Sequence, residues 1–170
     1  DNDICDSARG SNTHNGVSQF GAKVIEEMNR EGIMVDLSHA SEKSFYDALD
    51  ISSTPIVCSH SNCRALCDVP RNLTDDQLRA LAKRGGVAHT TFYHGFLRKA
   101  GEATVPDAIN KLDHSFDVMG IDNRDGLGLK LAARNGASSG IFLHEFPSIG
   151  ERMFWYGFIS LYRRPMKGLY

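Results

Sequence analysis

Apolar positions along the first two thirds of the chain follow two different periods, which predicts an ordered series of helices and strands. Four segments carry apolar residues at helical spacing and begin at Ser18, at Ser41, after Thr74 and near Pro106. Three short apolar runs lie between them, at 33–39, 54–60 and 86–93. The predicted order of alternating helices and strands is typical of a parallel sheet covered by helices.

Local signals mark where these helices begin and which faces they bury. Thr74 and Gln77 form a capping box, Ser41 is a suitable N-cap, and Gly85 supplies a stop. Each helix carries an apolar stripe predicted to face the core: Phe20, Val24, Ile25 and Met28; Phe45, Ala48 and Leu49; Leu78, Leu81 and Ala82; Ile109, Leu112, Phe116 and Met119.

The strand runs are continuously apolar, as in strands that are covered on both faces. A closed barrel and an open parallel sheet both fit this pattern. After Asp122 no clear period remains, although the segment clusters aromatic residues. We therefore predict a β/α region over residues 1–122 and an irregular, divergent C-terminal part over residues 123–170.

Composition excludes several classes of protein. The 170 residues are 41% hydrophobic and 24% charged, as expected for one globular domain, and the net charge of −2 without a basic block argues against nucleic-acid binding. No apolar stretch is long enough to span a bilayer. The spacing of the four cysteines fits neither a zinc ribbon nor a redox motif. We expect buried, reduced thiols, which slightly favour a cytoplasmic location.

Two of the predicted strands end in the same pair, Ser-His, at His39 and at His60. Functional residues of parallel β/α folds gather at the carboxyl ends of strands, and neutral imidazole is a common zinc ligand. The two histidines are therefore candidate ligands of one metal ion. A catalytic zinc needs a third protein ligand, and a simple hydrogen-bonding role for each histidine remains the alternative.

Two further polar residues accompany the histidines. Arg71, in the loop after the second strand, is suited to bind a carboxylate, or is a solvated loop charge. Asp36, inside the first strand, either orients a ligand from behind or accepts backbone hydrogen bonds. The other five histidines are predicted not to be ligands: His14, His89, His94, His114 and His144.

Several longer segments together resemble the membrane (renal) dipeptidase family of zinc dipeptidases. They are "ICDSA", "FGAKVIEEMNREGIMVDLSHAS", "PIVCSHSNCRALCDVPRNLTDDQLRALAKRGGV" and "LDHSFDVMGID". The resemblance implies a (β/α)8 barrel with two zinc ions, in which a metal-bridging hydroxide hydrolyses the peptide bond of a dipeptide. It also implies that His39 and His60 bind one zinc and that Arg71 contacts the substrate.

The chain also departs from the family pattern. The family's first-strand His-x-Asp pair, its bridging glutamate and a further substrate-binding histidine all precede the matched region, so we expect this chain to lack them. A later Gly-x-Gly-Ser/Thr-Asp-Phe-Asp-Gly strand end reads "GLGLKLAA" here. We therefore predict a fragment of about three to four β/α units that holds at most one partial zinc site and is inactive alone.

The C-terminal part invites a separate hypothesis. Shifted by one base, possible codons for "DGLGLKL" encode Gly-Leu-Gly-Ser-Asn, which is closer to the family, although the same frame places a stop codon at Met166–Lys167. An out-of-frame translation and true divergence both remain open. The unpaired edges of a partial barrel would also favour homo-oligomers.

Two other functions remain as alternatives to a dipeptidase. One is a different metal-dependent hydrolase on a barrel. The other is a non-catalytic or vestigial zinc-binding domain.

Overall fold

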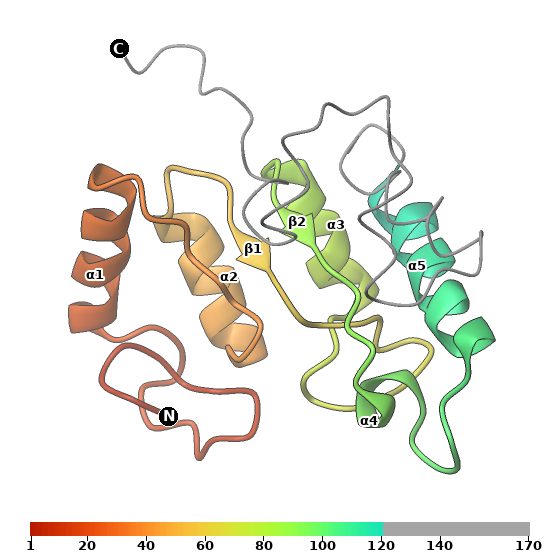
Figure 1. The fold of residues 1–170 in the computed structure, drawn as a ribbon. Helices are drawn as coiled ribbons and strands as arrows, with labels where there is room; N and C mark the ends of the chain where they lie inside the picture. Colours follow the sequence, from red (N-terminus) through yellow and green to blue (C-terminus); the bar gives the residue numbers. More distant parts are fainter. Residues whose placement is uncertain (121–170) are drawn as a thin grey trace.

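A computed structural model describes the chain over residues 1–120, and the predicted irregular part at 123–170 lies outside the described residues. Helices and strands follow one another across the molecule in chain order (Figure 1). The helices are α1 (Gln19–Arg30), α2 (Glu42–Ile51), α3 (Asp75–Lys83), α4 (His94–Leu97) and α5 (Val105–Met119), and the strands are β1 (Val57–Cys58) and β2 (Val87–Ala88).

The predicted helix starts are confirmed, because side chains satisfy the first backbone N–H groups where the sequence placed them. Ser18 and Ser41 accept from the N–H groups of Gly21 and Ser44. Thr74 and Gln77 form the reciprocal capping box at the start of α3. These helix boundaries are therefore set locally.

The sheet is parallel, as predicted, but its regular strands are much shorter than the apolar runs. β1 pairs with β2 through Val57 and Val87, and Asp36 forms a single parallel bridge with Val57. The predicted strand over 33–39 is thus extended chain beside β1 and not a regular strand. On the side of the first extended segment, the ladder stops early because side chains accept from the backbone past β1: Ser59 N–H donates to Asp36, and His60 N–H donates to Ser38 Oγ. On the side of β2, backbone hydrogen bonds continue between Cys58, Ser61 and His89.

Two details of the prediction were wrong. The run over 86–93 does not continue as a strand, because the chain turns at Tyr93 into α4, which buries Phe96 and Leu97. Phe20 does not face the core and is 60% exposed. The buried face of α1 instead centres on Ile25 and Gly21, and the backbone of Gly21 passes close to Ile4.

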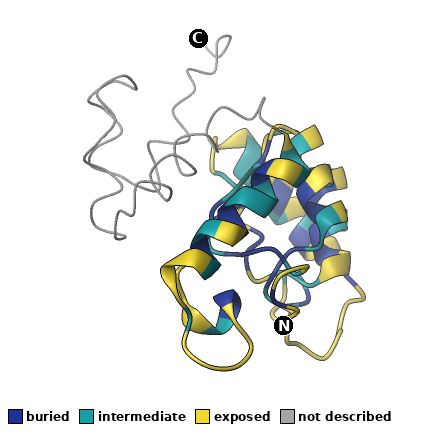
Figure 2. Cartoon of the chain, turned by 90° about the vertical axis from the view of Figure 1, so that its right-hand side faces the viewer, coloured by how far each residue is buried: buried dark blue, intermediate teal, exposed yellow. Residues whose placement is uncertain are grey.

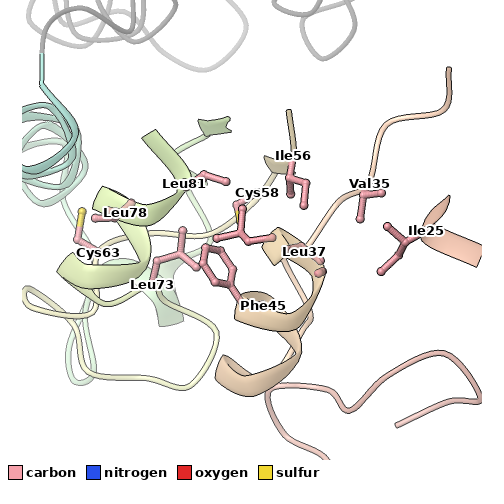
Figure 3. Packing of buried hydrophobic residues seen from close by; sticks show 12 residues of the cluster. Ile25, Val35, Leu37, Phe45, Ile56, Cys58, Cys63, Leu73, Leu78 and Leu81 are labelled. Atoms are coloured by element: carbon pink, nitrogen blue, oxygen red, sulfur yellow. The ribbon is translucent and has the colours of Figure 1, made fainter. Parts of the chain in front are cut away.

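The apolar core lies between the helices and the extended segments. Figure 3 shows Phe45 of α2 beside Cys58 of β1 and Leu73, and Ile25 beside Val35. Phe45 is completely buried. In Figure 2 the buried residues line the inner faces of the helices, and the exposed residues lie outside. The stripes of α2 and α3 therefore form one continuous core with the sheet.

An N-terminal loop, residues 1–17, covers one end of this arrangement. Its backbone pairs with the chain after the first extended segment: Ala8 N–H donates to the His39 carbonyl at 2.8 Å, and Ser7 bridges Ala40. The carbonyl of Asp6 accepts from Ser41 N–H and from Ser44 Oγ. The loop thereby fixes the backbone on which His39 stands.

All four cysteines lie within the described residues and are free thiols. Cys58, Cys63 and Cys67 are buried, and Cys5 is half-buried. Burial raises the pKa of the Cys58 thiol far above its ordinary value. The prediction of buried, unpaired thiols is confirmed. Within residues 1–120, no helix has the length and apolar character needed to cross a membrane.

Candidate active site

The two histidines predicted from the Ser-His pairs come together in space. His39 follows the first extended segment and His60 follows β1, so parallel pairing of these segments brings their ends side by side. The Nε2 atoms lie 2.9 Å apart, and the ring centroids lie 4.9 Å apart. The two Nε2 atoms are therefore close enough to share a metal ion, and they are also at hydrogen-bonding distance from each other.

Asp36 stands behind this pair and collects four hydrogen bonds. Its Oδ1 atom accepts from the backbone N–H groups of Ser38 and Ser59, at 3.0 and 3.1 Å, and from the hydroxyl of Ser38 at 2.7 Å. Its Oδ2 atom accepts from the hydroxyl of Ser59. Desolvation would raise the pKa of Asp36, but the donors on Ser59 and Ser38 outweigh it and lower the pKa. The carboxylate is therefore a fixed negative charge.

Ser59 connects this charge to the imidazole of His60. The Ser59 Oγ atom lies 2.7 Å from His60 Nδ1. A hydroxyl has one proton, and a carboxylate accepts but cannot donate. The Ser59 hydroxyl uses its proton to donate to Asp36, so Ser59 Oγ accepts from Nδ1–H of His60. The Nε2 atom of His60 then carries the lone pair. A metal-binding histidine commonly has its second nitrogen held in this way.

Arg71 lies beside the histidines. Its Nε–H donates to the carbonyl of Ser38 at 2.7 Å, and its Cζ atom stands 5.2 Å from the centroid of the Phe96 ring. The Nη2 atom is buried and has no hydrogen-bond partner among the described residues. A buried guanidinium nitrogen without an acceptor is costly, so this geometry suits an anionic ligand.

Positive charge gathers around these groups. Desolvation lowers the pKa of His39, and the nearby Arg71 and His60 lower it further. Desolvation and the nearby Arg9 likewise lower the pKa of Arg71, although Asp36 partly offsets this. His39 is therefore held in its neutral form, which is the form that binds metals.

The donor set and its spacing fit a zinc ion. Two nitrogen ligands on a tetrahedral zinc, each about 2.0–2.1 Å from the metal, lie about 3.3 Å apart. The observed 2.9 Å between the two Nε2 atoms is within a few tenths of an ångström of this spacing. Over residues 1–120, however, no group of three or more His, Cys, Asp or Glu side chains converges on one point. The described residues thus bring together two of the three protein ligands that a catalytic zinc site needs.

Sequence reasoning placed His39 and His60 at the carboxyl ends of the strands, Arg71 in the loop after the second strand and Asp36 inside the first strand. The structure brings all four into one neighbourhood. It did not find roles for Ser59, Phe96 or Arg9. The repeated Ser-His pair was a signal for Ser59, because a residue next to a ligand on a strand end can reach back to the neighbouring strand. Phe96 lies in the short helix α4 and Arg9 in the N-terminal loop, and tertiary contacts set the positions of both segments.

Parallel β/α units with ligand-type side chains at the carboxyl ends of their strands are typical of β/α metalloenzymes. The chain belongs to the membrane dipeptidases, peptidase family M19, because the sequence model of that family matches residues 1–130. This confirms the resemblance drawn from the sequence.

Curated relatives agree with the family. The chain is 44% identical over 115 residues to an uncharacterized dipeptidase of Schizosaccharomyces pombe, a match that covers 66% of this chain and 27% of that protein. It is 40% identical over 119 residues to human Dipeptidase 3, covering 66% of this chain and 24% of the relative. The chain therefore spans about a quarter of the length of these relatives.

Solved structures share the arrangement of the chain. An amidohydrolase from Pseudomonas aeruginosa superposes with a TM-score of 0.66 at 31% identity, covering 72% of this chain and 37% of that one. A metallo peptidase from Rhodobacter sphaeroides, liganded with a phosphinate mimic of the dipeptide L-Ala-D-Ala, gives 0.63 at 28% identity, covering 85% and 47%. The mixed α/β fold is thus that of the M19 structures.

Proposed function

We propose that the chain carries one part of the active site of a zinc dipeptidase, on three to four β/α units of a (β/α)8 barrel. The observation that supports this most directly is the 2.9 Å approach of His39 Nε2 to His60 Nε2 at the carboxyl end of the sheet. In this proposal both histidines bind the same zinc. Asp36 orients His60 through Ser59.

Arg71 is the proposed substrate-binding residue. Its Nε–H is already held by Ser38, while the buried Nη2 atom lacks an acceptor among the described residues. The carboxylate of a dipeptide would supply one, with the opposite charge. That a related metallo peptidase was crystallised with a mimic of L-Ala-D-Ala supports a dipeptide as the ligand class.

Zinc, when bound, lowers the pKa of water and polarises a carbonyl group. The chain's own residues hold the His39 imidazole neutral and place the Arg71 cation where the substrate carboxylate would bind. A second zinc and a bridging carboxylate, which the family resemblance implies, need ligands beyond those that residues 1–120 bring together. We therefore expect no dipeptide turnover from this chain alone.

Zinc binding by the chain tests the proposed site. Calorimetry should show one zinc equivalent, bound at least tenfold more weakly by His39→Ala or His60→Ala. Ser59→Ala should weaken binding roughly tenfold, through loss of the hydrogen bond to Nδ1. His94→Ala, at an exposed histidine on α4, and Ser53→Ala, at an exposed serine, are the matched controls.

Equal zinc affinity in the unsubstituted chain and all five variants would overturn the assignment of the ligands. Hydrolysis of L-Ala-D-Ala by the zinc-loaded chain would instead show that the catalytic donor set is complete. Zinc binding without hydrolysis in any longer form of the protein would favour the second candidate, a non-catalytic zinc-binding domain. The missing third donor within residues 1–120 is the observation that keeps this candidate open.

A further inference from the structure

The loop between β1 and α3, residues 61–73, carries Arg71 and is closed at its base by two buried asparagines. Asn62 and Asn72 are 2% and 1% exposed. The N–H of Asn62 donates to Oδ1 of Asn72 at 3.1 Å, and the N–H of Leu73 donates to the carbonyl of Asn62 at 2.7 Å. The side chain of Asn72 therefore closes the loop right beside Arg71.

The carboxamide of Asn72 also reaches a different segment. Its Nδ2 atom donates to the carbonyl of Cys67 at 2.8 Å, inside the loop, and to the carbonyl of Phe96 at 2.9 Å, in α4. Both Nδ2 protons and the Oδ1 atom of Asn72 are thus occupied. Phe96 is the residue whose ring lies against the guanidinium of Arg71. One side chain thereby links the loop that bears Arg71 to the helix that contacts it.

Asn62 provides a second connection between the same two segments. Its Nδ2 atom donates to the carbonyl of Thr91 at 2.9 Å, and its Oδ1 atom accepts from the N–H of Thr91 at 2.9 Å. Buried polar groups that are fully paired in this way hold a single arrangement, because breaking any bond leaves a partner unsatisfied. The 61–73 loop and the 91–96 segment are therefore fixed to each other.

We propose that Asn72 is a positioning residue for Arg71. It keeps the guanidinium between the Ser38 carbonyl and the Phe96 ring, so the 91–96 segment sets the orientation in which Arg71 meets a carboxylate. A flexible arginine loses rotational freedom when it binds, and an arginine already held in place loses less. The role of Arg71 toward a dipeptide carboxylate rests on the proposed function, whereas the coupling of Asn72 to Arg71 does not.

A purely structural role for Asn72 is the alternative, and Asn29 supplies a matched control. Asn29 lies on α1, and its Oδ1 atom accepts from the Ser52 hydroxyl at 3.1 Å and from the Ser53 N–H at 2.6 Å. Asn29→Ala therefore also removes side-chain hydrogen bonds that join two segments, but it does so away from Arg71. Both variants should lose stability, and only Asn72→Ala should release Arg71.

Hydrogen exchange of the Arg71 Nε–H, followed by nitrogen-15 NMR on the full 170-residue chain, measures this release. Asn72→Ala should speed the exchange about tenfold or more relative to Asn29→Ala, compared at equal loss of global stability, because the three buried hydrogen bonds of the Asn72 side chain are lost. Equal rates in the two variants would overturn the proposal.

The unsubstituted chain gives a second test if Asn72→Ala does not fold. The side-chain amide of Asn72, the Nε–H of Arg71 and the N–H of Thr91 should exchange through one opening, with the same dependence on denaturant. Exchange of the Arg71 proton through a separate, easier opening would contradict the coupling. Failure of zinc binding would remove the proposed function and leave this result untouched.

Discussion

At the residue scale, paired polar side chains decide the local structure of the molecule. Asp36 and Asp6 are both aspartates that collect hydrogen bonds from backbone N–H groups. Asp36 accepts hydrogen bonds at the strand ends that carry the histidines. Asp6 accepts hydrogen bonds within the N-terminal loop, whose backbone is hydrogen-bonded to His39. The two aspartates show how a short side chain can replace sheet or helix hydrogen bonds where the chain must turn.

Asp6 makes stability depend on pH. It is fully buried and accepts from the N–H groups of His14 and Gly16, each at 2.9 Å. Burial would raise the pKa of Asp6, but the N–H donors of Gly16 and His14 hold it below its ordinary value. A lowered pKa in the folded state adds stability above the unfolded pKa of about 4, and this is lost as the pH falls through the folded value.

Asp6→Asn should therefore be less stable than the unsubstituted chain at pH 7, and its stability should fall less steeply below about pH 4. Urea unfolding followed by circular dichroism between pH 3 and pH 7 measures both effects. Asp3→Asn, at an exposed residue of the same loop, is the control. If the free energy of unfolding falls equally steeply below about pH 4 in the unsubstituted chain and in Asp6→Asn, the prediction is contradicted.

At the scale of elements, capping and apolar spacing place the helices, and close backbone contact then selects particular residues. α1 contains Gly21, although glycine is a poor helix former. A Cβ atom at this position would lie 2.1 Å from the carbonyl oxygen of Ile4. The glycine thus lets the N-terminal loop approach the first turn of α1, and the loop in turn holds the backbone of His39.

Gly21→Ala should destabilise the chain by about 1–3 kcal/mol through steric overlap with a backbone carbonyl, which cannot move aside as a side chain can. Helix propensity alone predicts the opposite, a gain of about 1 kcal/mol. Thermal and urea unfolding measure the sign. Lys23→Ala, at an exposed position of the same helix, should stay within about 0.5 kcal/mol, and a gain in stability for Gly21→Ala would show that the contact is not as close as described.

At the scale of the whole molecule, one apolar core supports the candidate site at the end of the sheet. The core joins α1, α2, the sheet and α3, and the site lies where the strands end. The chain spans about a quarter of the length of its curated relatives, and within residues 1–120 no group of three or more His, Cys, Asp or Glu side chains could hold a metal ion. The described residues therefore provide the core that supports the candidate site, without a full set of metal-binding side chains.

Phe45→Ala tests whether this core acts as one unit. Phe45 is fully buried at the centre of the cluster, so its loss should cost about 3–5 kcal/mol and weaken every element together. Phe20→Ala, at the aromatic residue of α1 that is 60% exposed, should cost little. Urea unfolding by circular dichroism compares the two variants. If Phe45→Ala leaves no folded state to measure, Phe45→Leu gives a smaller loss in the same direction. Similar costs for Phe20→Ala and Phe45→Leu would contradict the described core.

The sequence by itself determined four of the five described helices, the parallel β/α order and the two histidines at the strand ends. These rest on local physics: Ser41 and Thr74 cap helices through neighbours three residues away, and apolar spacing follows the helical turn. The Ser-His pairs marked His39 and His60 because functional side chains cluster at the ends of parallel strands.

Only the tertiary structure decided how these residues act on one another. The link from Asp36 through Ser59 to His60, the contact of Arg71 with Phe96, and the closure by Asn72 join residues that are distant along the chain. Such contacts depend on strand register and loop path, which no local pattern encodes. The short pairing of the first extended segment with β1 has the same cause, because side chains at the site accept from the backbone N–H groups that would have extended the ladder.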